Sequence, residues 1–385
     1  MTTVKMVKLG TLIKPAKLQK CGNDDYPVLS MTMHNGLVFQ SDKFKKSVAS
    51  QDKSTYKVVH RNQLVIGFPI DEGVLATQRI TDAGIVSPAY GIWDVDQTKI
   101  IPEFLEYALR CNRAIDYYKA KLRGSTARRR SLPTPTLLEL DVPLPDIEQQ
   151  KLALTTIHHA KNALDSRQAQ LTKLDELVKA RFVEMFGDVI SNSNLWPICK
   201  FSEITSSRLG KMLDAKQQTG VHRYPYLANF NVQWFRFELK TLNSMDFNES
   251  DRIEFELHDG DLLVCEGGEI GRCAVWHNNV QPCYFQKALH RVRCNKDFIL
   301  PDFLAWWFKY NCDHGGFSAI EGAKATIAHL PGAKLKNLDV CVPPLPLQNQ
   351  FATFVEEVDK SKVEVQKALD QTQLLFDSLM QQYFG

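Results

Sequence analysis

The chain has 385 residues, of which 44% are hydrophobic and 24% charged, and its formal net charge is +3 at pH 7. This balance is typical of a folded globular protein and excludes a disordered, collagen-like or entirely coiled-coil chain. No stretch approaches the roughly 18 uncharged apolar residues of a membrane span, and the first residues lack the apolar core of a secretory signal. At about 100–200 residues per domain, the length predicts two or three domains.

The cysteine pattern predicts free thiols. The sequence contains 9 cysteines, an odd number, and no two have the Cys-x-x-Cys spacing of a zinc ribbon or a redox motif. Disulfide frameworks are typical of small secreted domains with an even cysteine count. We therefore expect reduced cysteines, no metal site and a cytoplasmic location.

Residues 1–145 form the first predicted domain, a block of mixed α/β character. An apolar run at residues 63–68 is bounded by turn-forming residues and predicts a strand. A helix is expected over residues 103–118, because it follows a proline and begins with an acidic residue. A Pro-rich joint at residues 142–146 then sets an extended entry into the next element.

Residues 146–190 are predicted to form a spacer helix. Neither Gly nor Pro interrupts residues 148–186, so this helix can run for about 38 residues, or roughly 57 Å at 1.5 Å per residue. Apolar residues recur every seven positions, with a second set between them, which is the pattern of a coiled-coil seam. The predicted seam residues are Ile157, Leu164, Leu171, Leu174, Val178 and Met185.

The same succession then follows a second time. Residues 191–343 are the second predicted α/β domain, with strands at 261–265 and 274–276 and a helix at 302–309. Another Pro-rich joint leads into a second spacer helix within residues 344–385. Its predicted seam residues are Val355, Val358, Val365, Leu369, Phe376, Leu379 and Tyr383.

The chain is an internal duplication. Residues 124–187 align with residues 322–385 without a gap, and both segments end in Phe-Gly. Upstream the match is weaker, but residues 62–65 still resemble residues 260–263. A self-similarity of this length indicates two copies of one structural unit.

Each spacer helix has one apolar stripe and needs a partner to cover it. The expected fold is therefore α+β, with two mixed α/β domains separated by two long antiparallel helices that form a coiled coil with a pseudo-two-fold repeat. The alternatives are that each helix packs onto its own domain, or that the chain dimerises through its helices.

Catalytic signatures are absent from the sequence. There is no phosphate-binding loop of the Gly-x-x-x-x-Gly-Lys-[Ser/Thr] type and no Asn/Asp-Pro-Pro-aromatic tetrad of an amino-methyltransferase. Pro145, Asp146 and Glu148 are not followed by the Glu-x-Lys of a metal-dependent nuclease. Acidic residues at that position are common in the first turn of a helix. We therefore expect a chain that binds and does not catalyse.

Basic clusters carry the binding chemistry. Residues 1–140 hold 21 basic and 13 acidic side chains. Within them, a ten-residue window around residues 124–126 carries five cations and no acid, and guanidinium groups on such a loop suit phosphates and guanine edges. The alternatives are a solvated loop or a dock for an acidic protein. The predicted DNA-binding residues are Lys43, Lys45, Lys46, Lys121, Arg123, Arg128, Arg129, Arg130, Lys211, Arg236, Arg272, Lys287, Arg291, Arg293 and Lys324.

This layout resembles the specificity subunit of type I restriction-modification systems. The resemblance rests on residues 132–150 and 330–350, each with a Leu-Pro element, a Pro-rich joint, a Gln and the long helix that follows. Residues 259–264 and 268–272 also resemble the pattern of that family's second variable block. The first block has no clear copy of the Gly-Glu-Ile-Gly-Arg stretch at 268–272.

The resemblance implies a division of labour. Each variable block would be a target recognition domain that reads one half of a bipartite double-stranded DNA target, and the paired helices would fix the unread spacer. The chain itself would hold no cofactor. It would dock two modification subunits that bring S-adenosylmethionine and methylate adenine. Where restriction accompanies modification, two restriction subunits would add translocation and cleavage driven by ATP with Mg.

Two other functions remain open. The chain could be an assembly scaffold that binds only protein, in which case the cluster at residues 121–130 contacts an acidic partner. A self-contained DNA methyltransferase or nuclease is the third interpretation, and the absence of catalytic motifs argues against it.

Overall fold

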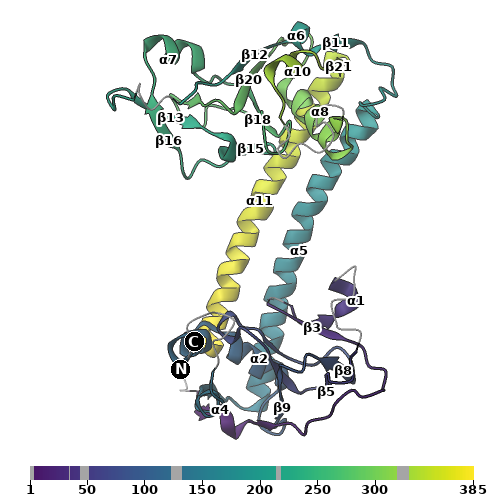
Figure 1. Cartoon of the computed structure of the whole chain (residues 1–385), viewed down its shortest axis with the longest axis vertical. Helices are drawn as coiled ribbons and strands as arrows, with labels where there is room; N and C mark the ends of the chain where they lie inside the picture. Colours follow the sequence, from purple (N-terminus) through teal and green to yellow (C-terminus); the bar gives the residue numbers. More distant parts are fainter. Residues whose placement is uncertain (1–3, 34, 44–51, 123–131, 214–217, 319–328) are drawn as a thin grey trace. The chain divides into compact units, whose positions relative to one another are not determined.

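The computed structural model describes residues 4–33, 35–43, 52–122, 132–213, 218–318 and 329–385 (Figure 1). The chain divides into two compact units. The first comprises Met1–Ala169 with Gln366–Gly385, and the second comprises Gln170–Val365. Two helices of 40 residues each, α5 (Ile147–Phe186) and α11 (Leu345–Phe384), contribute one part to each unit. No helix in the described ranges combines the length and apolar character needed to cross a membrane.

The first unit is built on an antiparallel sheet with strand order β2-β9-β6-β7. Two separate two-stranded sheets accompany it, β3-β4 and β5-β8, and β1 pairs with β10 beside the start of α5. Its elements are β1 (Met6–Lys8), β2 (Ile13–Pro15), β3 (Leu29–Thr32), β4 (Gly36–Phe39), α1 (Gln40–Lys43), β5 (Lys57–His60), β6 (Leu64–Ile66), β7 (Leu75–Thr77), β8 (Ala83–Val86), β9 (Gly91–Val95), α2 (Pro102–Arg110), α3 (Asn112–Lys121), α4 (Thr134–Leu138) and β10 (Asp141–Pro143).

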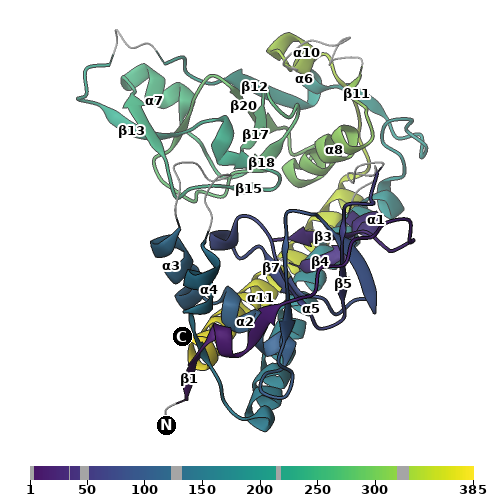
Figure 2. The ribbon, with the colours of Figure 1, turned by 60° about the horizontal axis from the view of Figure 1, so that its bottom comes forward.

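The second unit repeats this plan with the order β12-β20-β17-β18, and β11 pairs with β21. A mixed sheet, β16-β13-β19, is added, and α8 packs against β18 (Figure 2). Its elements are β11 (Ile198–Lys200), α6 (Phe201–Ile204), β12 (Thr205–Leu209), β13 (Arg223–Leu227), β14 (Val232–Gln233), β15 (Arg236–Phe237), β16 (Asn243–Asp246), α7 (Glu249–Phe255), β17 (Leu262–Cys265), β18 (Cys273–Val275), β19 (Tyr284–Phe285), β20 (Leu289–Cys294), α8 (Pro301–Asp313), α10 (Gly332–Lys336) and β21 (Asp339–Cys341).

The predicted α+β fold with two long helices is confirmed. The predicted strands at 63–68, 261–265 and 274–276 are β6, β17 and β18, each within about two residues of the expected bounds. One expectation is wrong: residues 103–118 are not a single helix. The backbone of Cys111 is extended, with φ −70° and ψ 160°, and it separates α2 from α3. The corresponding α8 runs on without a break to Asp313.

The two long helices run antiparallel within each unit. In the first unit, Arg167 of α5 donates hydrogen bonds to the Ala368 carbonyl and to the Thr372 hydroxyl of α11. In the second, Lys362 Nζ lies 2.8 Å from the Asp175 carboxylate. The residue numbers rise on one helix as they fall on the other, as an antiparallel coiled coil requires.

The heptad pattern matches the burial of the helices. Every predicted seam residue is buried or half-buried, and Ile157, Val178, Met185 and Val358 are buried. Arg167 and Thr372 occupy seam positions as polar residues. Because a polar seam contact is satisfied in only one register, this pair helps to fix how the helices align.

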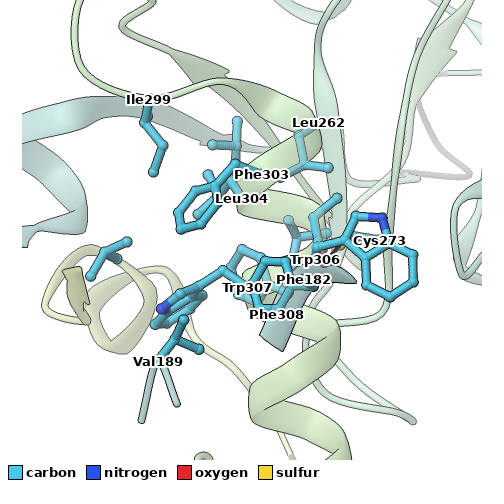
Figure 3. Packing of buried hydrophobic residues seen from close by; sticks show 14 of the residues in the cluster. Phe182, Val189, Leu262, Cys273, Ile299, Phe303, Leu304, Trp306, Trp307 and Phe308 are labelled. Carbon is cyan, nitrogen blue, oxygen red and sulfur yellow. Dashed lines mark hydrogen bonds between the residues drawn. The ribbon is translucent and has the colours of Figure 1, made fainter. Parts of the chain in front are cut away.

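Each unit closes its core with the end of a helix that begins in the other unit. Phe384 of α11 packs on Phe104 of α2, with ring centroids 4.9 Å apart. Phe186 of α5 packs on Phe303 of α8 in the same way, at 4.8 Å. Figure 3 shows the second core, where Phe182, Phe303 and Trp306 gather with other apolar side chains. The alternative in which each helix packs only onto its own domain is therefore excluded.

A buried glutamine fastens the start of each long helix. Gln150 accepts a hydrogen bond from the Ile101 amide at 2.8 Å and donates to the Lys99 and Pro145 carbonyls at 3.0 and 2.9 Å. Gln348 makes the same three bonds in the second unit, to Leu300, Phe298 and Pro343. Both side chains are fully buried. This clamp holds the loop before α2 or α8 against the first turn of the helix.

Replacing Gln150 with Ala should lower the free energy of unfolding of the first unit by about 2–4 kcal/mol, because the loop polar groups would stay buried without partners. Urea unfolding together with hydrogen exchange of residues 99–101 would measure the effect. Gln149→Ala, one position away and exposed, is the control and should change stability by less than about 0.5 kcal/mol. Equal losses in both variants would contradict the clamp.

Candidate nucleic-acid interface

A turn that contains glycine joins the last two strands of the four-stranded sheet in each domain. It spans residues 266–272 between β17 and β18, and residues 67–74 between β6 and β7. Two residues before the second strand, Gly271 and Gly73 both have left-handed backbones, with φ of +77° and +73°. A side chain at Gly271 would meet Phe308 and Phe317 at 3.0 Å, so only glycine fits there.

The first domain therefore contains a turn equivalent to residues 268–272, although its sequence has no clear copy of that stretch. The sequence of this turn is Gly-Phe-Pro-Ile-Asp-Glu-Gly-Val, at residues 67–74, and it differs from residues 268–272 at almost every position. The signal that they share is a glycine two residues before an apolar strand. That signal is too short to recognise until the strands are paired.

A second shared turn precedes the central strand. Asn62 and Gly260 are equivalent and both left-handed, with φ of +70° and +84°. The Gln63 amide oxygen and the Asp261 carboxylate each accept a hydrogen bond from the backbone of the histidine three residues before, at 2.8 and 2.9 Å. The predicted equivalence of residues 62–65 and 260–263 is confirmed by this geometry.

The structure gives Arg293 a partner at this turn. Its Nε lies 2.7 Å from Oδ1 of Asp261, whose side chain is only 3% exposed. In the first domain the equivalent contact is the bond from Gln63 Nε2 to Asp94 Oδ1, at 2.8 Å. The same backbone pairing therefore carries an ion pair in one domain and an amide–carboxylate bond in the other.

Three more predicted cations of the second domain also have internal partners. Arg291 donates to the Glu254 and Glu256 carbonyls at 2.7 and 3.2 Å. Arg272 donates to Asn229 at 3.0 and 3.2 Å, and Lys211 forms a mostly buried ion pair with Asp251. A side chain held in this way is less available for phosphate. The exposed candidates of this domain are Arg236 and Lys287.

The basic cluster of the first domain is only partly described. Lys121 is exposed at the end of α3, and Lys43 ends α1. The remaining candidates lie outside the described residues: Lys45, Lys46, Arg123, Arg128, Arg129, Arg130 and Lys324. Their assignment to DNA stays a prediction.

Each domain anchors a hairpin turn on the helix that follows its sheet. In the first, Arg110 of α2 donates to the Met33 carbonyl in the turn between β3 and β4. The buried carboxylate of Glu106 in turn lies 3.3 Å from Arg110 Nη1 and accepts two 2.8 Å bonds from Thr77. This network joins the hairpin turn and the end of β7 to one helix.

The second domain anchors its hairpin by aromatic stacking. The turn between β14 and β15 holds Phe235 in a left-handed backbone, φ +61°, which costs roughly 1–2 kcal/mol. Its ring stacks on Trp306 of α8 at 4.3 Å, and Lys309 lies 4.9 Å from the Trp234 ring. Sequence reasoning missed both anchors, because neither has a local pattern.

A buried histidine of the sheet contacts the segment that leads into α10. His290 of β20 is buried, and its Nε2 lies 3.0 Å from the Leu330 carbonyl, so that nitrogen carries the proton. Backbone bonds also tie Leu330 and His329 to the glycine-rich turn. Burial lowers the pKa of His290 below its ordinary 6.5. The histidine is therefore neutral in the folded domain.

Among the described residues, no group of His, Cys, Asp or Glu is arranged to hold a metal ion.

Near pH 6.5 the imidazole of His290 takes up a proton readily only in the unfolded chain. The free energy of unfolding of the second unit should therefore decrease as the pH falls below 6.5, and His290 should not affect it at higher pH. His290→Gln keeps a donor for Leu330 and removes the titration. The variant should lose less stability between pH 7 and 5 than the original chain, measured by urea unfolding at each pH. Parallel profiles would contradict this assignment.

Comparison with known proteins agrees with this geometry. A family model described as the type I restriction modification DNA specificity domain matches residues 194–372. A structure on complex assembly and conformational transition of the type I R-M system contains a chain with TM-score 0.62 and 14% identity, covering 100% of this chain and 98% of that one. The type I S subunit from M. genitalium gives TM-score 0.55 and 13% identity, with 100% and 97% covered. Residues 194–372 belong to the family of type I restriction modification DNA specificity domains, and the resemblance seen in the sequence is confirmed.

Proposed function

We propose that this chain is the non-catalytic specificity subunit of a type I restriction-modification enzyme and that it reads a bipartite DNA target. The observation that carries the proposal is the repeat. The second domain belongs to a DNA specificity family, and the first domain has the same strand order and the same two glycine-type turns. Two diverged copies of one recognition domain suit a target with two different halves.

The long helices would act as the ruler between the halves. Each has 40 residues, which is about 60 Å at 1.5 Å per residue. One turn of DNA is about 34–36 Å, so the helices are on the scale of one to two turns. The polar seam contact of Arg167 with Thr372 would keep that length constant by holding one register.

The partners would be other subunits of the same enzyme. We propose two modification subunits, which bring S-adenosylmethionine and methylate adenine, and restriction subunits that use ATP and Mg. A duplicated chain offers each partner two related surfaces. A solved chain with this fold comes from work on the assembly of such a system. The enzyme would act in the cytoplasm, on double-stranded DNA.

A protein-only scaffold is the second candidate. It is favoured by the internal partners of Lys211, Arg272, Arg291 and Arg293, which leave the second domain fewer free cations than the sequence suggests. Under this function the chain would bind its subunits but not DNA.

Selection from randomised duplex DNA by the chain assembled with its modification subunit would decide between them. We expect two short motifs at a fixed separation. Deleting one heptad from each long helix, residues 171–177 and 360–366, leaves Arg167 and Thr372 in place. The deletion removes about 10.5 Å and should shorten the gap by about three base pairs at 3.4 Å each. The motifs themselves should not change. A single continuous motif, or an unchanged gap, would contradict the ruler, and no enrichment at all would favour the scaffold.

The basic cluster at residues 121–130 supplies a second test. Changing Arg128, Arg129 and Arg130 together to Ala should weaken DNA binding and reduce the slope of log affinity against log salt by up to about three, because each phosphate contact contributes roughly 0.9. Fluorescence anisotropy over a salt series would measure it. The control changes three exposed helix lysines, Lys151, Lys161 and Lys173, to Ala. An unaltered slope in the arginine variant would contradict the assignment of these three arginines to the DNA interface.

A further inference from the structure

Each domain exposes a phenylalanine at the same end of its four-stranded sheet. Phe68 belongs to the turn between β6 and β7 and is 54% exposed. Phe230 lies beside the equivalent turn between β17 and β18 and is 50% exposed. A single exposed apolar residue is normal on a protein surface. Its recurrence at matching places of two diverged domains indicates a shared role.

In the first domain, the backbone on both sides of Phe68 is held in place. The amide of Gly67 donates a 2.8 Å hydrogen bond to the Val74 carbonyl across the turn. A side chain on Gly67 would come within 3.2 Å of the Tyr90 ring, so glycine lets that ring lie against the turn. Pro69, which follows, has a fixed φ. The exposed ring of Phe68 is therefore carried by a rigid turn.

In the second domain, a different segment supplies the ring. Phe230 is the middle residue of a short 3₁₀ helix. The Asn229 side chain donates a 2.9 Å hydrogen bond to the Gly267 carbonyl of the turn, and Arg272 donates to Asn229 at 3.0 and 3.2 Å. The buried side chain of Asn231 makes three bonds to backbone groups, at 2.8 to 3.0 Å. Both neighbours of Phe230 are therefore fixed, whereas its ring is half exposed.

The folded domains gain little from rings in these positions. Apolar side chains stabilise a fold by leaving water, and about half of each phenylalanine remains in contact with water. A rigid backbone below an exposed ring reduces the entropy that is lost when a ligand covers the ring. This combination is typical of a residue that contacts a ligand.

Exposed cations belong to the segments that pack on each turn. In the second domain, the Glu266 amide donates a 2.9 Å bond to the carbonyl of the residue after Lys287, which places the exposed Lys287 next to the turn. In the first domain, α3 packs against residues 70–72 of the turn and carries two exposed lysines in its last turn, Lys119 and Lys121. An aromatic ring with cations nearby suits a ligand that has both apolar and anionic groups.

Duplex DNA has this chemistry. Its phosphates pair with lysines, its thymine methyl groups offer an apolar contact, and an apolar side chain can also insert between neighbouring bases. The exposed acids of the turns, Glu72 and Glu269, are compatible with DNA, because a carboxylate accepts a hydrogen bond from the amino group of cytosine. The same charged residues disfavour a protein partner, since charged residues are depleted at the centre of protein interfaces.

We propose that Phe68 and Phe230 contact DNA bases and that each sets part of the sequence preference of its own domain. The proposal rests on the proposed function and deepens it, since it assigns specificity to two residues outside the basic clusters. Phe230 lies within the segment that matches a DNA specificity family, and Phe68 follows from the equivalence of the turns. The contact is apolar, with a thymine methyl group or with the faces of neighbouring bases.

Two single variants, Phe68→Ala and Phe230→Ala, test this in the chain assembled with its modification subunit. The controls replace exposed apolar residues beyond the opposite ends of the same sheets, Ile80→Ala after β7 and Phe298→Ala after β20, whose side chains are 40% and 48% exposed. Fluorescence anisotropy measures affinity for the selected target duplex, for duplexes with one base pair changed at a time, and for the target over a salt series. Urea unfolding monitors the fold of each variant.

Each alanine variant should bind the target roughly tenfold more weakly, as expected for a lost base contact, and should discriminate less at one or two base pairs. These base pairs should lie in one half of the target for Phe68→Ala and in the other half for Phe230→Ala. The salt slope should stay the same, because a phenyl ring neutralises no phosphate. Both controls should change the affinity by less than about twofold.

Two further substitutions define the contact. Phe68→Leu and Phe230→Leu keep an apolar side chain and should retain more affinity than the alanine variants. Replacing thymine with uracil, one position at a time, identifies a methyl contact. Where this replacement weakens binding by the original chain, it should not weaken binding by the corresponding alanine variant further.

Unchanged base discrimination in the alanine variants overturns the proposal. So does an equal loss of affinity for all duplexes, because the ring would then support the fold or the binding of the DNA backbone. Weaker assembly with the modification subunit, at unchanged discrimination, also overturns it and identifies a protein contact. If the original chain in its assembly prefers no base pair at all, the proposed function itself fails.

Discussion

The antiparallel pairing of α5 and α11 is the constraint on which the rest of the structure depends. Neither helix can cover its apolar stripe alone, and neither domain can complete its core alone. Phe384 closes the core around Phe104 of the first domain, and Phe186 closes the core around Phe303 of the second. The core of each domain is therefore completed by the C-terminal end of the long helix that begins in the other unit. Loss of one helix would open both cores, which explains why the helices have stayed alike while the domains diverged.

The duplication preserved backbone geometry more strictly than side-chain chemistry. The turn before the central strand is left-handed at Asn62 and at Gly260, and the residue after it accepts the same backbone bond in both domains. Yet the cross-strand partner of that residue is Asp94 in one domain and Arg293 in the other. The backbone is conserved because buried polar groups need hydrogen-bond partners. The charge of a side chain can change sign, provided that its cross-strand partner changes with it.

Regular features of the sequence predicted the elements, and tertiary contacts decided the rest. The seven-residue repeat and the Pro-rich joints placed both long helices within two residues of their observed ends, because periodicity and helix breakers are local. The break at Cys111 was missed, since an extended residue inside an apolar helical pattern has no local signature. The pairing of Lys211 with Asp251, which lies 40 residues away in sequence, also depends on the fold. Basic residues could be counted from the sequence, but their availability could not.

The charges also differ between the two units where the helix after the sheet meets the long helix, and this difference affects the pKa of a carboxyl group. In the first unit, Glu103 of α2 lies between Arg79 and the ring of His158. In the second, its counterpart Asp302 has Glu356 and Asp359 nearby, and burial together with these carboxylates raises its pKa. A carboxyl with a raised pKa weakens the fold at neutral pH, where it must be ionised. The carboxylate of the first unit therefore has cationic neighbours, whereas burial disfavours ionisation of the carboxyl group in the second.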